Sequence, residues 1–104
     1  MAIAEVTIVP LGTATPSVSR YVAEVHKVLE QAEEAVKFQM TPMSTIIEGD
    51  LNDILAVIRR MHEVPFTKGA ERVSTSIRID DRRDIAGSME QKIRSVQEKL
   101  KELD

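Results

Sequence analysis

Hydrophobic and polar residues alternate along four short stretches of the chain, a pattern typical of strands that bury one face. The stretches predicted as strands are residues 2–9, 36–40, 44–48 and 72–80. In the first strand the apolar face carries Ala4, Val6 and Ile8, and the opposite face is half polar. In the fourth strand one face carries Val73, Thr75, Ile77 and Ile79. Because alternate residues point to opposite faces, we expect helices to cover the apolar face of the first strand.

Two stretches between these strands repeat apolar residues every three or four positions, as amphipathic helices do. They are predicted at residues 17–35, capped by Ser17 or Ser19, and at residues 50–64, capped by Asp50 and ended by Pro65. His26 lies beside the apolar stripe of the first helix. With no second His or Cys near it, a place at the edge of the core is favoured over metal ligation.

A third helix is predicted from the Ser-x-x-Gln capping box at residues 88–91 to the end of the sequence. Its apolar residues are spaced four and three apart: Met89, Ile93, Val96, Leu100 and Leu103. This seam is narrower than the stripe of a helix that lies on a sheet, and it is closer to a coiled-coil face. The helix therefore either packs against a neighbouring subunit or closes the edge of its own sheet.

The order of predicted elements is βαββαβ followed by one helix, which places the chain in the α+β class. Right-handed crossovers in both halves give a four-stranded antiparallel sheet with two helices on one face, the ferredoxin-like sandwich with an extra C-terminal helix. The other face of the sheet would expose Ile3 and Val9, an apolar patch of the kind that monomers avoid. We therefore expect a homo-oligomer, with a two-fold dimer as the simplest cover for this face.

Length and composition restrict the class of protein. A chain of 104 residues is expected to form one domain, residues 1–104, with a single core. It has no cysteine, no apolar run long enough for a membrane, and an N-terminus without the basic region of a signal peptide, which fits a cytoplasmic location. The net charge of −3 argues against nucleic acid as a partner.

No grouping of residues predicts a catalytic centre, a cofactor site or a metal site. The two histidines, His26 and His62, are in separate helices, and the four glycines are scattered and form no phosphate loop. Three arginines interleave with acids near the end of the fourth strand: Arg78, Arg82 and Arg83. They are interpreted either as a solvated turn with local ion pairs or as a site for a phosphate or sulfate at a subunit junction.

Residues 39–50 combine a break, a strand and a carboxylate in one short segment. Pro42 cannot donate to a sheet ladder, so it marks the turn between the second and third strands. Glu48 stands at the end of an otherwise apolar strand, where it is either a solvated residue beside a turn or part of a site. Alternation does not settle which face of this strand is inward, because Thr45 shares a face with Ile47 while Ile46 shares one with Glu48.

Five segments of the chain resemble, in order, the small thiamine-binding family of ferredoxin-like proteins. They are PLG at 10–12, SVSRYV at 17–22, TPMSTIIEGD at 41–50, RVSTSIRIDDRRD at 72–84, and 89–96. This resemblance implies a non-catalytic protein that binds thiamine or its hydroxymethylpyrimidine part at or near a subunit interface, in dimers that pair into tetramers. Salvage, transport or sensing of thiamine is the physiological role that the resemblance implies.

The chemistry of such a ligand suggests which residues hold it. An aminopyrimidine presents a ring nitrogen beside an amine, which a carboxyl group can pair, and the thiazolium cation favours negative charge. The resemblance places this function most firmly on Glu48 and Thr45, and then on Ser19 and Tyr21. Ser44 is expected to add a hydroxyl contact, while Tyr21, Phe38 and Met43 are expected to pack against the ring. The alternative function is an oligomeric sensor of anions or nucleotides that uses Arg78, Arg82 and Arg83.

Overall fold

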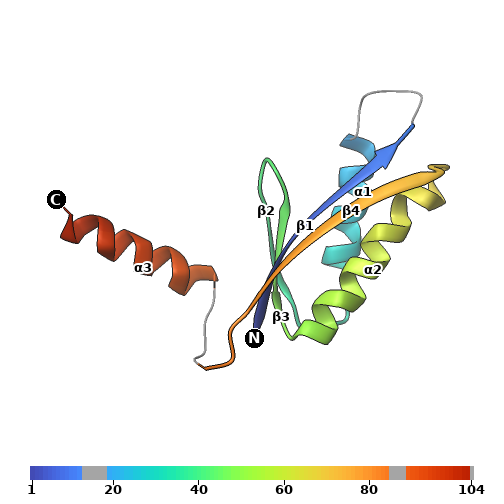
Figure 1. Cartoon of the computed structure of the whole chain (residues 1–104). Helices are drawn as coiled ribbons and strands as arrows, with labels where there is room; N and C mark the ends of the chain where they lie inside the picture. The colour runs from blue at the N-terminus through green and yellow to red at the C-terminus, as the bar shows by residue number, and fades with distance from the viewer. Residues whose placement is uncertain (13–18, 85–88, 104) are drawn as a thin grey trace.

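The fold is a ferredoxin-like α+β sandwich with an additional C-terminal helix (Figure 1). The computed structural model describes residues 1–12, 19–84 and 89–103, and for Ser19, Arg20 and Met89 it describes the backbone alone. The elements are β1 (Ala2–Leu11), α1 (Ser19–Glu30), β2 (Lys37–Met40), β3 (Thr45–Gly49), α2 (Leu51–Thr67), β4 (Arg72–Asp81) and α3 (Met89–Glu102). The strands form one antiparallel sheet in the order β2-β3-β1-β4, and α1 and α2 cover one of its faces.

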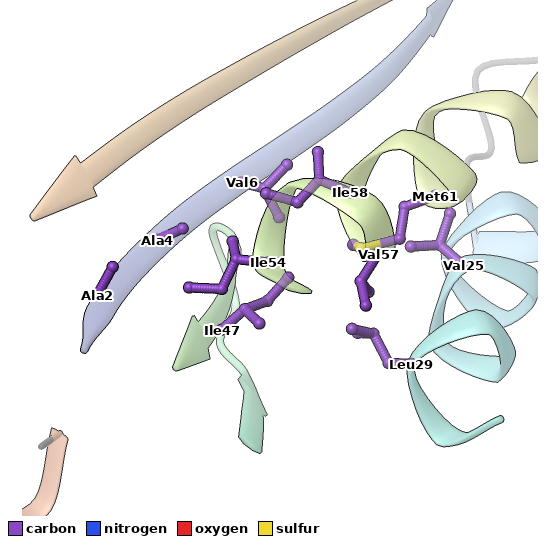
Figure 2. Close-up of a cluster of buried hydrophobic side chains, with 10 residues drawn as sticks. All are labelled: Ala2, Ala4, Val6, Val25, Leu29, Ile47, Ile54, Val57, Ile58 and Met61. Carbon is purple, nitrogen blue, oxygen red and sulfur yellow. The ribbon is translucent and has the colours of Figure 1, made fainter. Parts of the chain in front are cut away.

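The strand register assigns every side chain of the sheet to one of the two faces. Ala4 of β1 lies opposite Ile47 of β3 and Ile79 of β4, and directly opposed residues share a face. These residues belong to the helix-covered face, as the alternation in β1 predicts. Among the described residues, the core on this side contains ten buried ones (Figure 2): Ala2, Ala4, Val6, Val25, Leu29, Ile47, Ile54, Val57, Ile58 and Met61.

The helix α1 ends at Glu30, five residues before the predicted end, because tertiary contacts direct the following segment. Glu34 accepts two hydrogen bonds from the guanidinium of Arg60 in α2. The chain then passes close to the sheet, where a Cβ on Gly49 would approach the carbonyl oxygen of Ala35 and Cγ1 of Val36, both at 3.1 Å. Gly49 therefore allows this close approach, and the chain turns into β2 where the apolar spacing alone favoured more helix.

The helix α2 continues through Pro65 to Thr67, so the expectation that Pro65 ends the helix is wrong. Proline removes one N–H and restricts the residue before it, but this proline lies in the last turn and its ring is buried in the core. The carbonyl oxygen of Pro65 accepts hydrogen bonds from the backbone N–H groups of Lys68 and Ala70, at 3.1 and 3.0 Å. Gly69, with φ of 97°, provides the left-handed residue of this ending.

The helix caps predicted from the sequence differ in outcome. Asp50 occupies the N-cap position of α2 with an extended backbone, and its carbonyl oxygen accepts the bond from Ile54 N–H at 2.9 Å, but its side chain makes no capping bond. The predicted cap of α3, Ser88, lies outside the described residues, and so does Ser17 before α1.

The strand β1 extends two residues beyond the prediction, to Leu11, because β4 pairs with it along its whole length.

The helix α3 extends away from the sheet and does not pack on it (Figure 1). An ion pair between Lys92 and Asp80 joins its first turn to the end of β4. Its apolar side chains Ile93, Val96 and Leu100 are all more than half exposed. The sequence predicts that α3 either packs against a neighbouring subunit or closes the edge of the sheet. Among the described residues, α3 does not close that edge.

Candidate functional site

A hollow of about 160 Å³ opens between α1 and the β2–β3 hairpin, on the helix-covered side of the sheet. We call it the hairpin hollow; its wall includes Ile8 of β1, Tyr21 and Val22 of α1, and Met43, Ser44 and Thr45 of the hairpin. Val25 and Met61, which are both buried, line it on the side of the core. The structure therefore brings together four of the predicted ligand-binding residues, which are Tyr21, Met43, Ser44 and Thr45.

The shape of the hairpin turn depends on Thr41, which precedes Pro42. The Thr41 hydroxyl accepts hydrogen bonds from the backbone N–H groups of Ser44 and Met43, at 3.0 and 3.4 Å, and donates to the Ser44 carbonyl at 2.9 Å. Pro42 fixes a negative φ, and no described residue other than glycine has a positive φ, so the usual hairpin turns with left-handed residues are excluded. The Thr41 side chain replaces part of that backbone bonding and holds Met43 and Ser44 at the rim.

The lining of the hairpin hollow is neutral. Among the described residues that line it there is no Lys, Arg, His, Asp or Glu, and its polar groups are mainly hydroxyls, including those of Tyr21, Ser44 and Thr45. The Thr45 hydroxyl makes no hydrogen bond to another described residue, so it is available to a ligand. A cavity of roughly 150 Å³ is large enough to hold one six-membered ring such as benzene. The hollow therefore suits a single neutral ring that can pair with hydroxyl groups.

Phe38 and Ser19 stand outside this group of residues. Phe38 packs against the core, and its ring meets that of His26 edge to face, with the ring centroids 5.4 Å apart. His26 Nε2 lies 2.9 Å from Oε1 of Glu30, which agrees with its expected place at the edge of the core. Ser19 begins α1, but its side chain lies outside the described residues.

Glu48 is buried, with 5% of its surface exposed, but the structure does not place it with the hairpin hollow. It lies opposite Ile3 of β1 and Lys37 of β2, on the face of the sheet that the helices leave open. Thr45 lies opposite Val6, on the helix-covered face. The register thus settles the ambiguity of β3, because Thr45 and Glu48 point to opposite sides of the sheet.

The arginines of the alternative site lie within the second half of β4, in the case of Arg78, and just beyond its end, in the case of Arg82 and Arg83. Arg78 is opposite Glu5 on the open face. Arg82 donates two hydrogen bonds to Asp84, at 2.6 and 3.0 Å, and Arg83 donates two to Asp81, at 3.1 and 2.8 Å. The bond from Arg83 holds the pKa of the Asp81 carboxyl below its ordinary value. In this arrangement the guanidinium groups of Arg82 and Arg83 are each bound to a carboxylate rather than directed together at an anion.

Sequence reasoning did not identify Thr41, or the cations Lys68 and Arg72 that line a second hollow beside Tyr21. The Thr-Pro dipeptide is a sequence signal for Thr41, because a hydroxyl before proline often bonds to the following backbone. No sequence signal marks Lys68 and Arg72, since α2, β1 and β4 bring them beside Tyr21 only in the fold.

Within the described ranges, no three His, Asp or Glu side chains are arranged to hold a metal ion, and no helix has the length and hydropathy needed to cross a membrane.

Comparison with known proteins gives a family that spans most of the chain. Residues 4–97 match the family model described as "Thiamine-binding protein". The UPF0045 protein YqgV of Bacillus subtilis (strain 168) is 61% identical over 102 residues, which are 96% of this chain and 98% of that protein.

Solved structures share the same fold. A hypothetical protein, MJ1052, from Methanocaldococcus jannaschii superimposes with a TM-score of 0.81 at 34% identity, over 93% of this chain and 96% of the other. A Thermotoga maritima protein, named as a candidate for thiamine biosynthesis or salvage, has a TM-score of 0.73 over 91% of this chain and 97% of its own. Its identity of 15% supports a likeness in fold alone.

Proposed function

Because this chain belongs to the thiamine-binding protein family, we propose that it binds thiamine or its hydroxymethylpyrimidine part without catalysis, as a homo-oligomer in the cytoplasm. The observation that carries the proposal is the convergence of Tyr21, Met43, Ser44 and Thr45 on one neutral hollow. These residues come from α1 and from the hairpin, and they are the types that an aminopyrimidine requires. Salvage, transport or sensing of thiamine is the role we assign to such binding.

The match between the hairpin hollow and an aminopyrimidine rests on size, charge and hydrogen bonding. The ring carries no charge, so its burial in an uncharged lining avoids the large cost of desolvating an ion, provided that its polar groups are hydrogen-bonded. Its nitrogens and amine can accept from and donate to hydroxyls such as those of Ser44 and Thr45. Tyr21 and Met43 add polarizable surface that packs against a flat ring. The thiazolium cation then remains outside the hollow, near its rim.

Two features of the surface support assembly with further copies of this chain. The strand β4 is ten residues long and lies at the edge of the sheet, where no strand among the described residues pairs with its outer side. A second copy paired antiparallel about Ser76 would set Arg72 of each copy opposite Asp80 of the other, which joins opposite charges. The apolar residues Ile77 and Ile79 of β4 are exposed by 44% and 43%, and α3 adds its own exposed seam.

We also propose that the hairpin hollow lies near a subunit interface. Met43 is 84% exposed at its rim, and Met40 beside it is exposed as well. An exposed pair of methionines at the mouth of an apolar hollow is the kind of surface that a second subunit covers. Light scattering after size exclusion tests the assembly, and we expect a mass well above the 11.6 kDa of one chain. A clean monomer at micromolar concentration would contradict both interface proposals.

Calorimetric titration tests the binding function directly. We expect heat and saturation with thiamine and with hydroxymethylpyrimidine, and none with a nucleotide. The reverse result, binding of phosphate or nucleotide alone, would instead support the sensor that uses Arg78, Arg82 and Arg83. Mass spectrometry of the recovered ligand tests the absence of catalysis, because an enzyme would return a changed molecule.

A further inference from the structure

A second hollow lies beside the hairpin hollow, and Tyr21 lines both of them. Its volume is about 480 Å³. It is bounded by Leu11 and Gly12 at the end of β1, by Lys68 and Gly69 at the end of α2, and by Glu71 and Arg72 at the start of β4. We call it the basic hollow. Pro10 lines the first hollow and Leu11 the second, and these consecutive residues face opposite sides of the sheet. The two hollows therefore meet at the end of the sheet, where Tyr21 borders both.

The turn after α2 fixes the charges of the basic hollow. The backbone N–H of Gly69 bonds to the Phe66 carbonyl at 3.2 Å, and the left-handed φ of Gly69 reverses the chain between Lys68 and Arg72. Nζ of Lys68 lies 3.8 Å from Oε1 of Glu24, a distance that leaves its charge only loosely compensated.

Arg72 differs from the arginines at the far end of β4. Among the described residues, no carboxylate lies within ion-pair distance of its guanidinium, whereas Arg82 and Arg83 are each bound to one. Glu71 is the one acid among the described residues that line the basic hollow, against the two cations Lys68 and Arg72. The lining therefore carries a net positive charge, which favours an anion.

The chemical character of the surface changes from the hairpin hollow to the basic hollow. It begins with a neutral hollow for one ring, continues with the phenol ring of Tyr21, and ends with the basic hollow. Resting on the proposed function, we propose that the preferred ligand is a phosphate monoester of thiamine. Its neutral pyrimidine occupies the hairpin hollow, its thiazolium cation lies over the face of Tyr21, and its phosphate lies between Lys68 and Arg72.

Calorimetric titration of the wild-type protein with thiamine, thiamine monophosphate and inorganic phosphate tests this inference. We expect the monophosphate to bind roughly five- to tenfold more tightly than thiamine, the gain that contacts with two cations at a partly exposed site supply together. The preference should fall when the salt concentration rises, because these charges are open to solvent. Inorganic phosphate alone should bind far more weakly, since it lacks the ring.

The double variant K68Q/R72Q should bind both ligands with equal affinity and should bind thiamine as the wild type does. The variant R94Q is the matched control, because it removes the same type of charge from α3, which does not pack on the sheet, and it should keep the preference. Equal affinity of the wild type for the two ligands, or a preference that survives in K68Q/R72Q, would overturn the inference while thiamine binding stands. Failure of both ligands to bind the wild type would instead refute the proposed function.

Discussion

Replacing Thr45 by valine tests whether the hairpin hollow is the ligand site. Thr45 begins β3, where it lies opposite Val6 of β1 and Met40 of β2. Its side chain is half-buried and lines the hollow, and its hydroxyl bonds to no other described residue. Valine has the same shape and a similar preference for strands, so the substitution removes one hydroxyl group and little else.

The magnitude follows from the loss of a single hydrogen bond to a neutral ligand. Such a bond contributes roughly 0.5–1.5 kcal/mol, which corresponds to binding that is about two- to twelvefold weaker. The free energy of unfolding should change by less than about 0.5 kcal/mol, because the substitution removes no hydrogen bond between Thr45 and another described residue. Thr45→Val should therefore weaken binding of hydroxymethylpyrimidine and leave the stability of the fold nearly unchanged.

The matched control is Thr75→Val, which should have the opposite effects. The Thr75 hydroxyl shares a hydrogen bond with Nδ1 of His62 at 2.6 Å, and Thr75 lines neither the hairpin hollow nor the basic hollow. Its loss should lower the melting temperature without changing affinity. Calorimetry and thermal denaturation on both variants measure the two effects. If Thr45→Val binds as tightly as the wild type, the ligand does not use this hydroxyl and the hairpin-hollow site is refuted.

Three further substitutions test the other parts of the structure. Glu48→Gln should leave thiamine affinity unchanged, since Glu48 points away from the hairpin hollow, and a large loss in calorimetry would move the site to the open face. Glu34→Gln should lower stability at neutral pH, because the hydrogen bond from Arg60 lowers the pKa of Glu34 in the folded state. This contribution is present above the ordinary pKa of 4.5 and is lost as the pH falls through the lowered value, so melting curves of wild type and variant should converge in acid and not in base. Ile54→Ala should cost about 2–5 kcal/mol in chemical denaturation, since Ile54 is fully buried, while Leu55→Ala on the exposed side of α2 should cost less than about 1 kcal/mol.

The fold could be predicted from the sequence where local pattern and tertiary structure agree. The strand β1 alternates cleanly, and its residues Ala4 and Val6 lie in the core as the pattern indicates. Agreement fails where a contact between distant segments overrides the local preference. The apolar spacing through Ala35 favours helix, but the close approach of the chain to Gly49 and the ion pair of Arg60 end α1 at Glu30.

The candidate site could be predicted only in its parts. Residue types and the family resemblance drew attention to Tyr21 and to the hairpin, and the fold brings these together. The neutral lining could not be predicted, because it depends on which side of the sheet each residue of β3 faces. Both faces of β3 mix apolar and polar residues, so only the pairing with β1 resolves the choice. Lys68 and Arg72 could not be predicted as site residues either, because they become neighbours of Tyr21 only through the arrangement of α2, β1 and β4.

The separation of Thr45 from Glu48 by three positions restricts any model of binding. An odd separation in a strand places two side chains on opposite faces, so a ligand that lies within one face of the sheet contacts only one of the two. A ligand between α1 and the hairpin meets the hydroxyl of Thr45, and a ligand on the open face meets the carboxylate of Glu48 beside Lys37. The first environment is neutral and suits a ring, whereas in the second the two charged residues Glu48 and Lys37 are direct partners in the strand register. A loss of affinity in Thr45→Val together with its retention in Glu48→Gln would therefore assign the ligand to the helix-covered side, and the opposite pair of results would assign it to the open face.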